Sequence, residues 1–150
     1  MKIYREFGIS GIIWFCLNDY RTQMGEEGEG RLRRRVHGSA DLYGNPKPSY
    51  ETVKRECAPL YISSINAVNT DEKTSGVEIV IANKNALPCY EAKGYHLAGF
   101  DGTGCLISYT ALTPLKPGET QKIFLADAQS QLARIAIQRP NGAESISYFI

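Results

Sequence analysis

The sequence predicts a mainly β protein, in which an antiparallel β-sandwich follows a strand, a long loop and a helix. Two observations lead to this fold class. From Pro59 to Ile150, short runs of alternating apolar residues are separated by turn residues roughly every ten positions. Before Pro59 the chain shows one continuous apolar run, a long polar segment and one stretch with helical spacing. We therefore expect two parts, residues 1–58 and residues 59–150.

The first part contains an apolar run over Gly8–Arg21, with the sequence GISGIIWFCLNDYR. Apolar residues occupy both parities of this run, whereas a strand with one face in water would alternate. We expect a strand covered on both faces, as parallel strands are inside α/β folds. Functional residues gather at the C-terminal ends of such strands. The polar and aromatic residues at this end are Trp14, Asn18, Asp19, Tyr20 and Arg21.

A long polar segment, Thr22–Asn45, follows the run, and connections of this length are usually functional or disordered. It contains GEEGEG at 25–30 and RLRRR at 31–35, whose opposite charges we expect to neutralise one another. One or two of these arginines remain candidates for contact with an anionic ligand. Apolar residues at helical spacing then predict a helix over about Pro48–Cys57, which Pro59 ends.

The second part is predicted to contain seven short strands. That number of strands, with a turn between each pair, is the pattern of an immunoglobulin-like sandwich. Asn141-Gly142, between two alternating runs, is the strongest hairpin signal in the chain. The predicted strands are Leu60–Asn69, Val77–Asn83, Tyr95–Phe100, Cys105–Leu112, Thr120–Leu125, Ala133–Gln138 and Ser145–Ile150.

The composition argues against several classes of protein. The formal net charge is +1, so no overall field attracts nucleic acid or a membrane surface. No apolar run approaches the roughly 20 residues that a membrane helix needs. Four cysteines without a CxxC pair and only two histidines give little support for zinc, and we expect no metal and no cofactor. We expect free, mostly buried thiols, with a bridge between Cys89 and Cys105 as the alternative.

Four segments of the first part together resemble one enzyme family. They are Gly11-Ile12-Ile13-Trp14, Asn18-Asp19-Tyr20-Arg21-Thr22, Gly38–Asp41 and Gly44-Asn45-Pro46-Lys47-Pro48-Ser49-Tyr50. Their order and spacing resemble the last strand, loop and helix of the catalytic (β/α)8 barrel in glycoside hydrolase family 2, the β-galactosidase and β-glucuronidase family. Members of this family can carry an immunoglobulin-like domain after the barrel, and the segment Leu115–Thr120 resembles a recurrent pattern in such domains.

The resemblance implies that this chain is the C-terminal part of a retaining glycosidase that acts on β-glycosides. Residues 1–58 would be the last strand, loop and helix of the barrel, and residues 59–150 an immunoglobulin-like domain. The family uses two glutamates, at the ends of the fourth and seventh barrel strands, as acid/base and nucleophile. No catalytic residue is therefore expected in this chain, and the chain alone is expected to be inactive.

The same resemblance implies that Trp14, Asn18, Asp19 and Arg21 contribute to substrate binding. An indole face suits the apolar face of a pyranose, so Trp14 would form part of the wall of a sugar subsite. The other three residues are expected either to bond sugar hydroxyls or to hold the loop. The commoner family pattern places an acid four residues after the Trp, where this chain has Asn18 and then Asp19.

A second class of function is a stand-alone β-sandwich module for carbohydrate binding or adhesion, without catalysis. Such a module needs exposed aromatic residues on the sandwich, and the candidates are Tyr90, Tyr95, Phe100 and Tyr109. Under either function the expected partner is a carbohydrate, with no nucleic acid and no membrane. An apolar strand without its barrel needs a cover, so a homo-oligomer through this strand is a further expectation.

Overall fold

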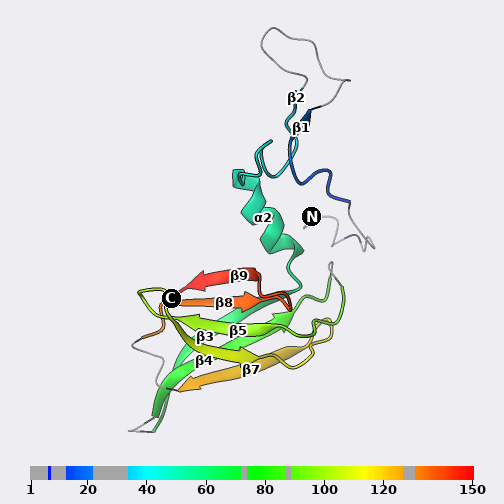
Figure 1. Cartoon of the computed structure of the whole chain (residues 1–150). Helices are drawn as coiled ribbons and strands as arrows, with labels where there is room; N and C mark the ends of the chain where they lie inside the picture. The colour runs from blue at the N-terminus through cyan, green and yellow to red at the C-terminus, as the bar shows by residue number, and fades with distance from the viewer. Residues whose placement is uncertain (1–6, 8–12, 22–33, 72–73, 87–88, 127–130) are drawn as a thin grey trace. The chain divides into compact units, whose positions relative to one another are not determined.

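The computed structural model divides the chain into two compact units, Met1–Cys57 and Ala58–Ile150. It describes residues 7, 13–21, 34–71, 74–86, 89–126 and 131–150. Each unit has its own secondary structure (Figure 1).

The described residues of the first unit form two short strands and one helix. Strand β1 (Tyr20–Arg21) pairs antiparallel with β2 (Arg34–Arg35). Helix α2 spans Pro48–Cys57, which is the range predicted from the sequence. Its first turn carries an acidic residue and its last turn two basic ones, and these charges complement the helix dipole. Because none of its residues is buried, these local signals explain the helix better than packing does. No helix in the described ranges is long and apolar enough to cross a membrane.

The predicted strand over Gly8–Arg21, covered on both faces, is wrong for the described residues. Residues 13–17 form no strand, and ladder pairing begins only at Tyr20. Ile13 is 95% exposed, Phe15 67% and Leu17 63%. Residues 8–12 lie outside the described residues. A continuous apolar run becomes buried only where other elements pack against it. In this structure Ile13, Phe15 and Leu17 are exposed to solvent.

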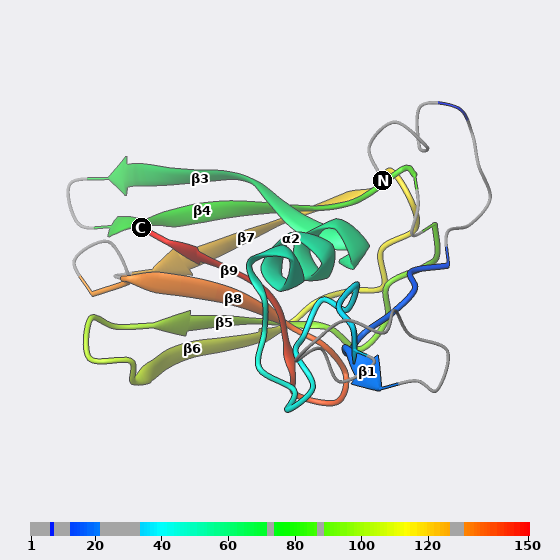
Figure 2. The same cartoon turned by 90° about the horizontal axis from the view of Figure 1, so that it is seen from above.

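The described residues of the second unit form seven strands in two antiparallel sheets (Figures 1 and 2). One sheet has the order β3-β4-β7 and the other the order β6-β5-β8-β9. All seven predicted strands are confirmed, with ends that shift by a few residues. The strands are β3 (Leu60–Asp71), β4 (Thr74–Asn83), β5 (His96–Phe100), β6 (Leu106–Ala111), β7 (Thr120–Ala126), β8 (Arg134–Gln138) and β9 (Glu144–Phe149).

Both sheets contribute to a single hydrophobic core. Ile79 and Ile81 of β4 alternate with less buried residues and are fully buried. Leu97 of β5 and Ile135 and Ile137 of β8 join the same cluster from the other sheet. The alternation seen in the sequence thus corresponds to one buried face on each sheet. The architecture is mainly β and consistent with a β-sandwich.

The predicted hairpin at Asn141-Gly142 is confirmed, because β8 and β9 pair antiparallel on either side of it. The Gly142 N–H donates to the Arg139 carbonyl at 2.9 Å, and the Arg139 N–H donates to the Ala143 carbonyl at 2.9 Å. Gly142 has a φ of +80°, which glycine adopts without steric cost. The turn therefore depends on glycine at this position.

Candidate functional site

The candidate site lies in the first unit, where residues before β1 contact the loop that leads to α2. The Asp19 N–H donates to the Ala40 carbonyl, and the Ala40 N–H donates to the Leu17 carbonyl, both at 2.8 Å. A side chain on Gly38 would collide with the backbone of Asn18 and Asp19. Glycine at position 38 thus allows the two segments to approach closely, and the contact joins segments that carry the family resemblance.

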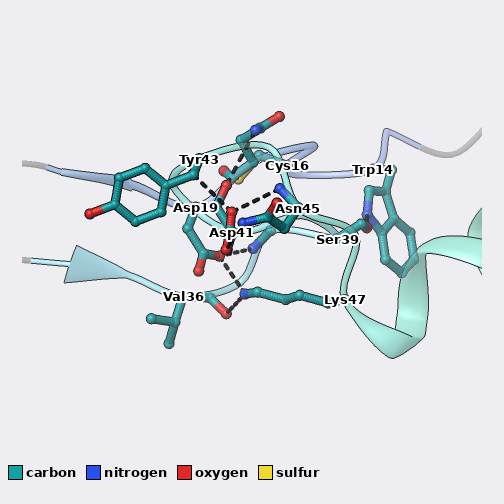
Figure 3. A network of polar contacts seen from close by, with 11 residues as sticks. Trp14, Cys16, Asp19, Val36, Ser39, Asp41, Tyr43, Asn45 and Lys47 are labelled. Atoms are coloured by element: carbon teal, nitrogen blue, oxygen red, sulfur yellow. Dashed lines mark hydrogen bonds and ion pairs between the residues drawn. The ribbon is translucent and has the colours of Figure 1, made fainter.

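Asp19 is the central polar residue of this contact (Figure 3). It is only 6% exposed. Its Oδ1 lies 2.5 Å from Lys47 Nζ and accepts a hydrogen bond from the Gly38 N–H at 2.9 Å. Lys47 Nζ also donates to the Val36 carbonyl at 3.0 Å. These charge-assisted hydrogen bonds replace the water that the buried carboxylate has lost. Of the two roles expected for Asp19, this geometry supports the one that holds the loop.

Trp14 is the aromatic residue among the four predicted site residues, and it is exposed to solvent. Its indole Nε1 donates to Ser39 Oγ at 2.9 Å, and Ser39 is almost fully buried. Trp14 as a whole is 48% exposed, so the hydrogen bond holds the Nε1 edge while part of the residue stays open to solvent. Figure 3 shows Trp14 beside Ser39, at one side of the polar network. A fixed, half-open indole can stack against an apolar ligand face.

Asn18 and Arg21, the other predicted site residues, lie in different surroundings. Asn18 Nδ2 donates to the Asp41 carbonyl at 3.3 Å, and the residue is partly buried. Arg21 is exposed, and its backbone pairs with Arg34 in the small sheet. The structure therefore brings Trp14, Asn18 and Asp19 to one loop, while Arg21 lies on β1. Of the basic run at 31–35, residues 31–33 lie outside the described residues.

Asp41 begins a tight turn that ends at Asn45. Its carboxylate accepts hydrogen bonds from the Tyr43 N–H, the Asn45 N–H and the Asn45 side chain. The Asn45 amide and backbone hold the pKa of Asp41 below its ordinary value of 3.8. Gly44 closes the turn with a φ of +87°. The turn shapes the loop on which Ser39 and Lys47 stand.

An aromatic trio that the sequence did not predict lies next to the loop. The rings of Phe15 and Tyr20 meet edge to face with centroids 6.0 Å apart, and His37 lies 6.3 Å from Tyr20 and 6.4 Å from Phe15. His37 thus lies beside two aromatic rings of the segment that leads into β1. The sequence separation between Phe15 and His37 hides this contact from a local reading.

The aromatic candidates on the sandwich are divided between core and surface. Tyr95 is buried, and this burial, followed by the hydroxyl contact with Tyr90, raises its pKa. Phe100 lies under the Arg134 guanidinium, 4.0 Å from the ring centroid. Tyr109 is exposed and stacks on His96 with centroids 4.7 Å apart. The four residues therefore do not form one exposed cluster.

The cysteines are free, as predicted, but the expectation that they are mostly buried is wrong. Cys57, Cys89 and Cys105 are exposed and Cys16 is partly buried. Cys89 and Cys105 form no bridge. Over the ranges that the structure describes, no group of three or more potential metal ligands comes together.

Comparisons with known proteins complete the description of this site. No family model, no curated protein and no solved structure matches the chain. The geometry of the site offers a half-exposed indole bonded to Ser39 and a loop held by hydrogen bonds.

Proposed function

We propose that this chain is the C-terminal part of a retaining glycoside hydrolase of the β-galactosidase and β-glucuronidase type. In this proposal Trp14 forms part of the wall of a sugar subsite. Asn18, Asp19 and the loop from Gly38 to Lys47 hold that wall in place, and Arg21 stays a candidate contact to sugar hydroxyls. The second unit is a structural accessory domain of the same enzyme.

The observation that carries the proposal is the common network of the resemblance segments. Ser39 bonds the indole of Trp14, and Lys47 neutralises the buried Asp19. Gly38 has no side chain at the point where the two segments touch. Residues 14, 19, 38, 39 and 47 are far apart in the sequence, yet all five take part in the contact between the same two segments. All five also lie in segments that carry the family resemblance.

The exposed row of Ile13, Phe15 and Leu17 also supports the proposal. Large apolar side chains are costly to leave in water, at about 25 cal/mol for each Å² of apolar surface. In the longer enzyme of this proposal, the rest of the barrel would cover these side chains. Under the proposal, these three side chains would be buried in a larger protein.

The connectivity of the sandwich supports its assignment as an immunoglobulin-like accessory domain. The chain passes from one sheet to the other after β4, after β6 and after β7. As a result β5 lies between β6 and β8, which are distant in sequence. Antiparallel sandwiches of three and four strands with such Greek-key crossings are typical of this domain class.

The proposed chemistry needs two carboxylates about 5 Å apart, one as nucleophile and one as acid/base. Asp19 is unsuited to either role because its oxygen is bonded to Lys47 and Gly38. Asp41 is unsuited to the acid role because its pKa is lowered, whereas a general acid needs a raised pKa. The catalytic glutamates would belong to earlier barrel strands of the parent enzyme.

The experiment pairs an assay with a sequence extension. The purified chain should show no turnover of chromogenic β-galactosides or β-glucuronides. The coding sequence upstream of the Met1 codon should encode barrel strands with a glutamate at the ends of the fourth and seventh. Protein-dependent hydrolysis by this chain alone, or an upstream sequence without a barrel, would overturn the proposal.

A second candidate function is a carbohydrate-binding or adhesion module without catalysis. The observation in its favour is the exposed ring of Tyr109, which His96 holds in place by stacking. Calorimetric titration with oligosaccharides tests it directly. Saturable heat that Tyr109→Ala abolishes would favour this function, whereas an absence of heat would count against it.

A further inference from the structure

Strand β6, with the sequence LISYTA, is an edge strand of the four-stranded sheet. Among the described strands its hydrogen-bonded neighbour in that sheet is β5 (Figure 2). Leu106 is 54% exposed, Ile107 39% and Tyr109 52%. No charged residue occurs from Gly102 to Leu115. Natural edge strands usually carry charges or prolines that discourage pairing with another chain.

The backbone of β6 has hydrogen-bonding groups that point away from β5. The Leu112 N–H donates to the Tyr95 carbonyl at 2.9 Å. Hydrogen-bonded pairs recur at every second residue of an antiparallel ladder. Counting back from Leu112, the backbone N–H and C=O groups of Thr110 and Ser108 therefore point toward β5. The N–H and C=O groups of Tyr109 and Ala111 then point outward. The register shifts between Gly99 and Phe100, so this regular alternation holds for the part of β6 from Ser108 onward.

The other edges of the described sheets differ from β6. On β7, Lys122 lies 3.3 Å from Glu78 and places a charge at that edge. On the opposite side of the sandwich, the Ile62 N–H of β3 donates to the Tyr148 hydroxyl of β9 at 3.4 Å. That bond joins the β3 and β9 edges of the two sheets. Strand β3 is also free of charged residues from Leu60 to Thr70, but Tyr61 is its one exposed large hydrophobic residue among those that the structure describes, whereas β6 exposes three.

We propose that β6 is a docking site for β6 of a second copy of this chain. The two strands pair antiparallel about a twofold axis and join the two four-stranded sheets into one. A twofold contact places identical segments against each other, so a charged residue close to the axis would face its own copy and weaken the contact. The neutral sequence from Gly102 to Leu115 has no such residue. The outward groups of Tyr109 and Ala111 on each copy supply matching donors and acceptors.

The stack of Tyr109 on His96 prepares the side chains for this contact. The planes are 13° apart and the centroids 4.7 Å apart, so the Tyr109 ring is already ordered before association. An ordered aromatic ring loses little conformational freedom on binding. Paired β6 strands would set this ring beside small or β-branched side chains of the partner strand, a favourable cross-strand combination.

Sedimentation measurements on the full chain over a range of protein concentrations test the proposal. We expect a reversible equilibrium between monomer and dimer. Tyr109→Pro removes an outward N–H without removing a bond to β5, and Tyr109→Lys sets two like charges near the axis. Each variant should raise the dissociation constant by at least about tenfold. Circular dichroism melts check that both variants remain folded, and the lysine variant decides the matter if the proline variant does not fold.

Two matched controls separate this contact from other modes of association. Phe149→Lys changes an exposed aromatic on β9, at the other edge of the same sheet, and should leave the dimer intact. Phe15→Lys changes the exposed apolar row of the first unit and should also leave it intact. A chain that is monomeric at every concentration would overturn the proposal. A dimer that Phe15→Lys abolishes and both Tyr109 variants spare would overturn it as well.

Discussion

Asp19 and Lys47 show how single residues hold the loop of the first unit. A carboxylate that is 4% exposed needs a partner, because an unpaired buried charge is strongly destabilising. Lys47 supplies that partner from a position that is itself 27% exposed, so its ammonium group keeps part of its hydration. The pair is therefore worth more as a specific link between two segments than as a source of net stability.

Lys47→Met tests this link. The variant should lower the stability of the first unit by about 1–3 kcal/mol, because the Asp19 carboxylate stays buried with fewer donors. Trp14 is the only tryptophan in the chain, so its fluorescence during denaturation reports on this unit. Lys54→Met is the control, since the Lys54 side chain is 30% exposed, about as much as Lys47, but its partner at 3.8 Å is the exposed Glu51. This variant should cost less than about 0.5 kcal/mol. Equal effects of the two variants would contradict the role given to Lys47.

Trp14 should matter for catalysis in the longer enzyme that the proposed function requires. Trp14→Ala should lower kcat/KM by about 10- to 100-fold, because a stacked aromatic surface contributes roughly 1.5–3 kcal/mol to sugar binding. Trp14→Phe, which keeps a flat ring but loses the bond to Ser39, should recover part of the loss. Full activity of the alanine variant on β-glycosides would remove Trp14 from the sugar subsite.

Asp101 should make the stability of the sandwich depend on pH. Hydrogen bonds from the Thr103 side chain and the Cys105 N–H hold the pKa of Asp101 below its ordinary 3.8. The folded state therefore prefers the carboxylate, and this contribution is present above about pH 4 and lost as the pH falls through the folded pKa. Asp101→Asn keeps an acceptor oxygen but does not titrate. In thermal melts, its difference from the unaltered chain should be largest near pH 7 and shrink in acid; a constant difference would contradict this.

At the scale of elements, the chain uses the same turn in both units. In Asp41–Asn45 and in Asp101–Cys105, an aspartate accepts backbone hydrogen bonds from residues two and four positions later. In each turn the fourth residue is a glycine with positive φ, +87° at Gly44 and +86° at Gly104. The sequence pattern Asp-x-x-Gly-x thus specifies one backbone shape in two different surroundings.

The turn between β5 and β6 offers a matched pair of glycines to test this. Gly104→Ala should destabilise the sandwich by about 1–2 kcal/mol, because a side chain disfavours its left-handed backbone. Gly102→Ala should have almost no effect, since a Cβ there meets no atom within 4 Å and the residue has no positive φ. Chemical denaturation followed by circular dichroism measures both. If the two variants behave alike, the conformation of Gly104 is not what matters.

Elements with a strong local signal could be predicted from the sequence, and elements that depend on distant cover could not. Helix α2 follows from Pro48 and the spacing of its residues, and β8 and β9 follow from alternation around Asn141-Gly142. The prediction for the run before β1 was wrong because an apolar sequence alone does not show whether other segments pack against it. Within the site, Trp14 was predicted from the resemblance, but its bond to Ser39 joins positions 25 residues apart and has no local signal.

At the scale of the whole molecule, the two units differ in how they are stabilised. The sandwich has a core with residues from both sheets, whereas helix α2 buries none of its residues. Residues 58–150 expressed alone should therefore fold and unfold cooperatively, since a domain of about this size can support its own core. Far-ultraviolet circular dichroism and a thermal melt measure this. A spectrum typical of an unfolded chain would show that the sandwich needs the first unit.

The exposed thiols are attachment points for a dye in energy-transfer measurements of distance. Trp14 on the first unit is a single intrinsic donor for energy transfer, and Cys105 on the second unit can carry a thiol-linked acceptor dye. With the other cysteines replaced by serine, transfer between the two positions measures the distance between the units in solution. The same labelled protein, titrated with an oligosaccharide, would report whether a ligand changes that distance.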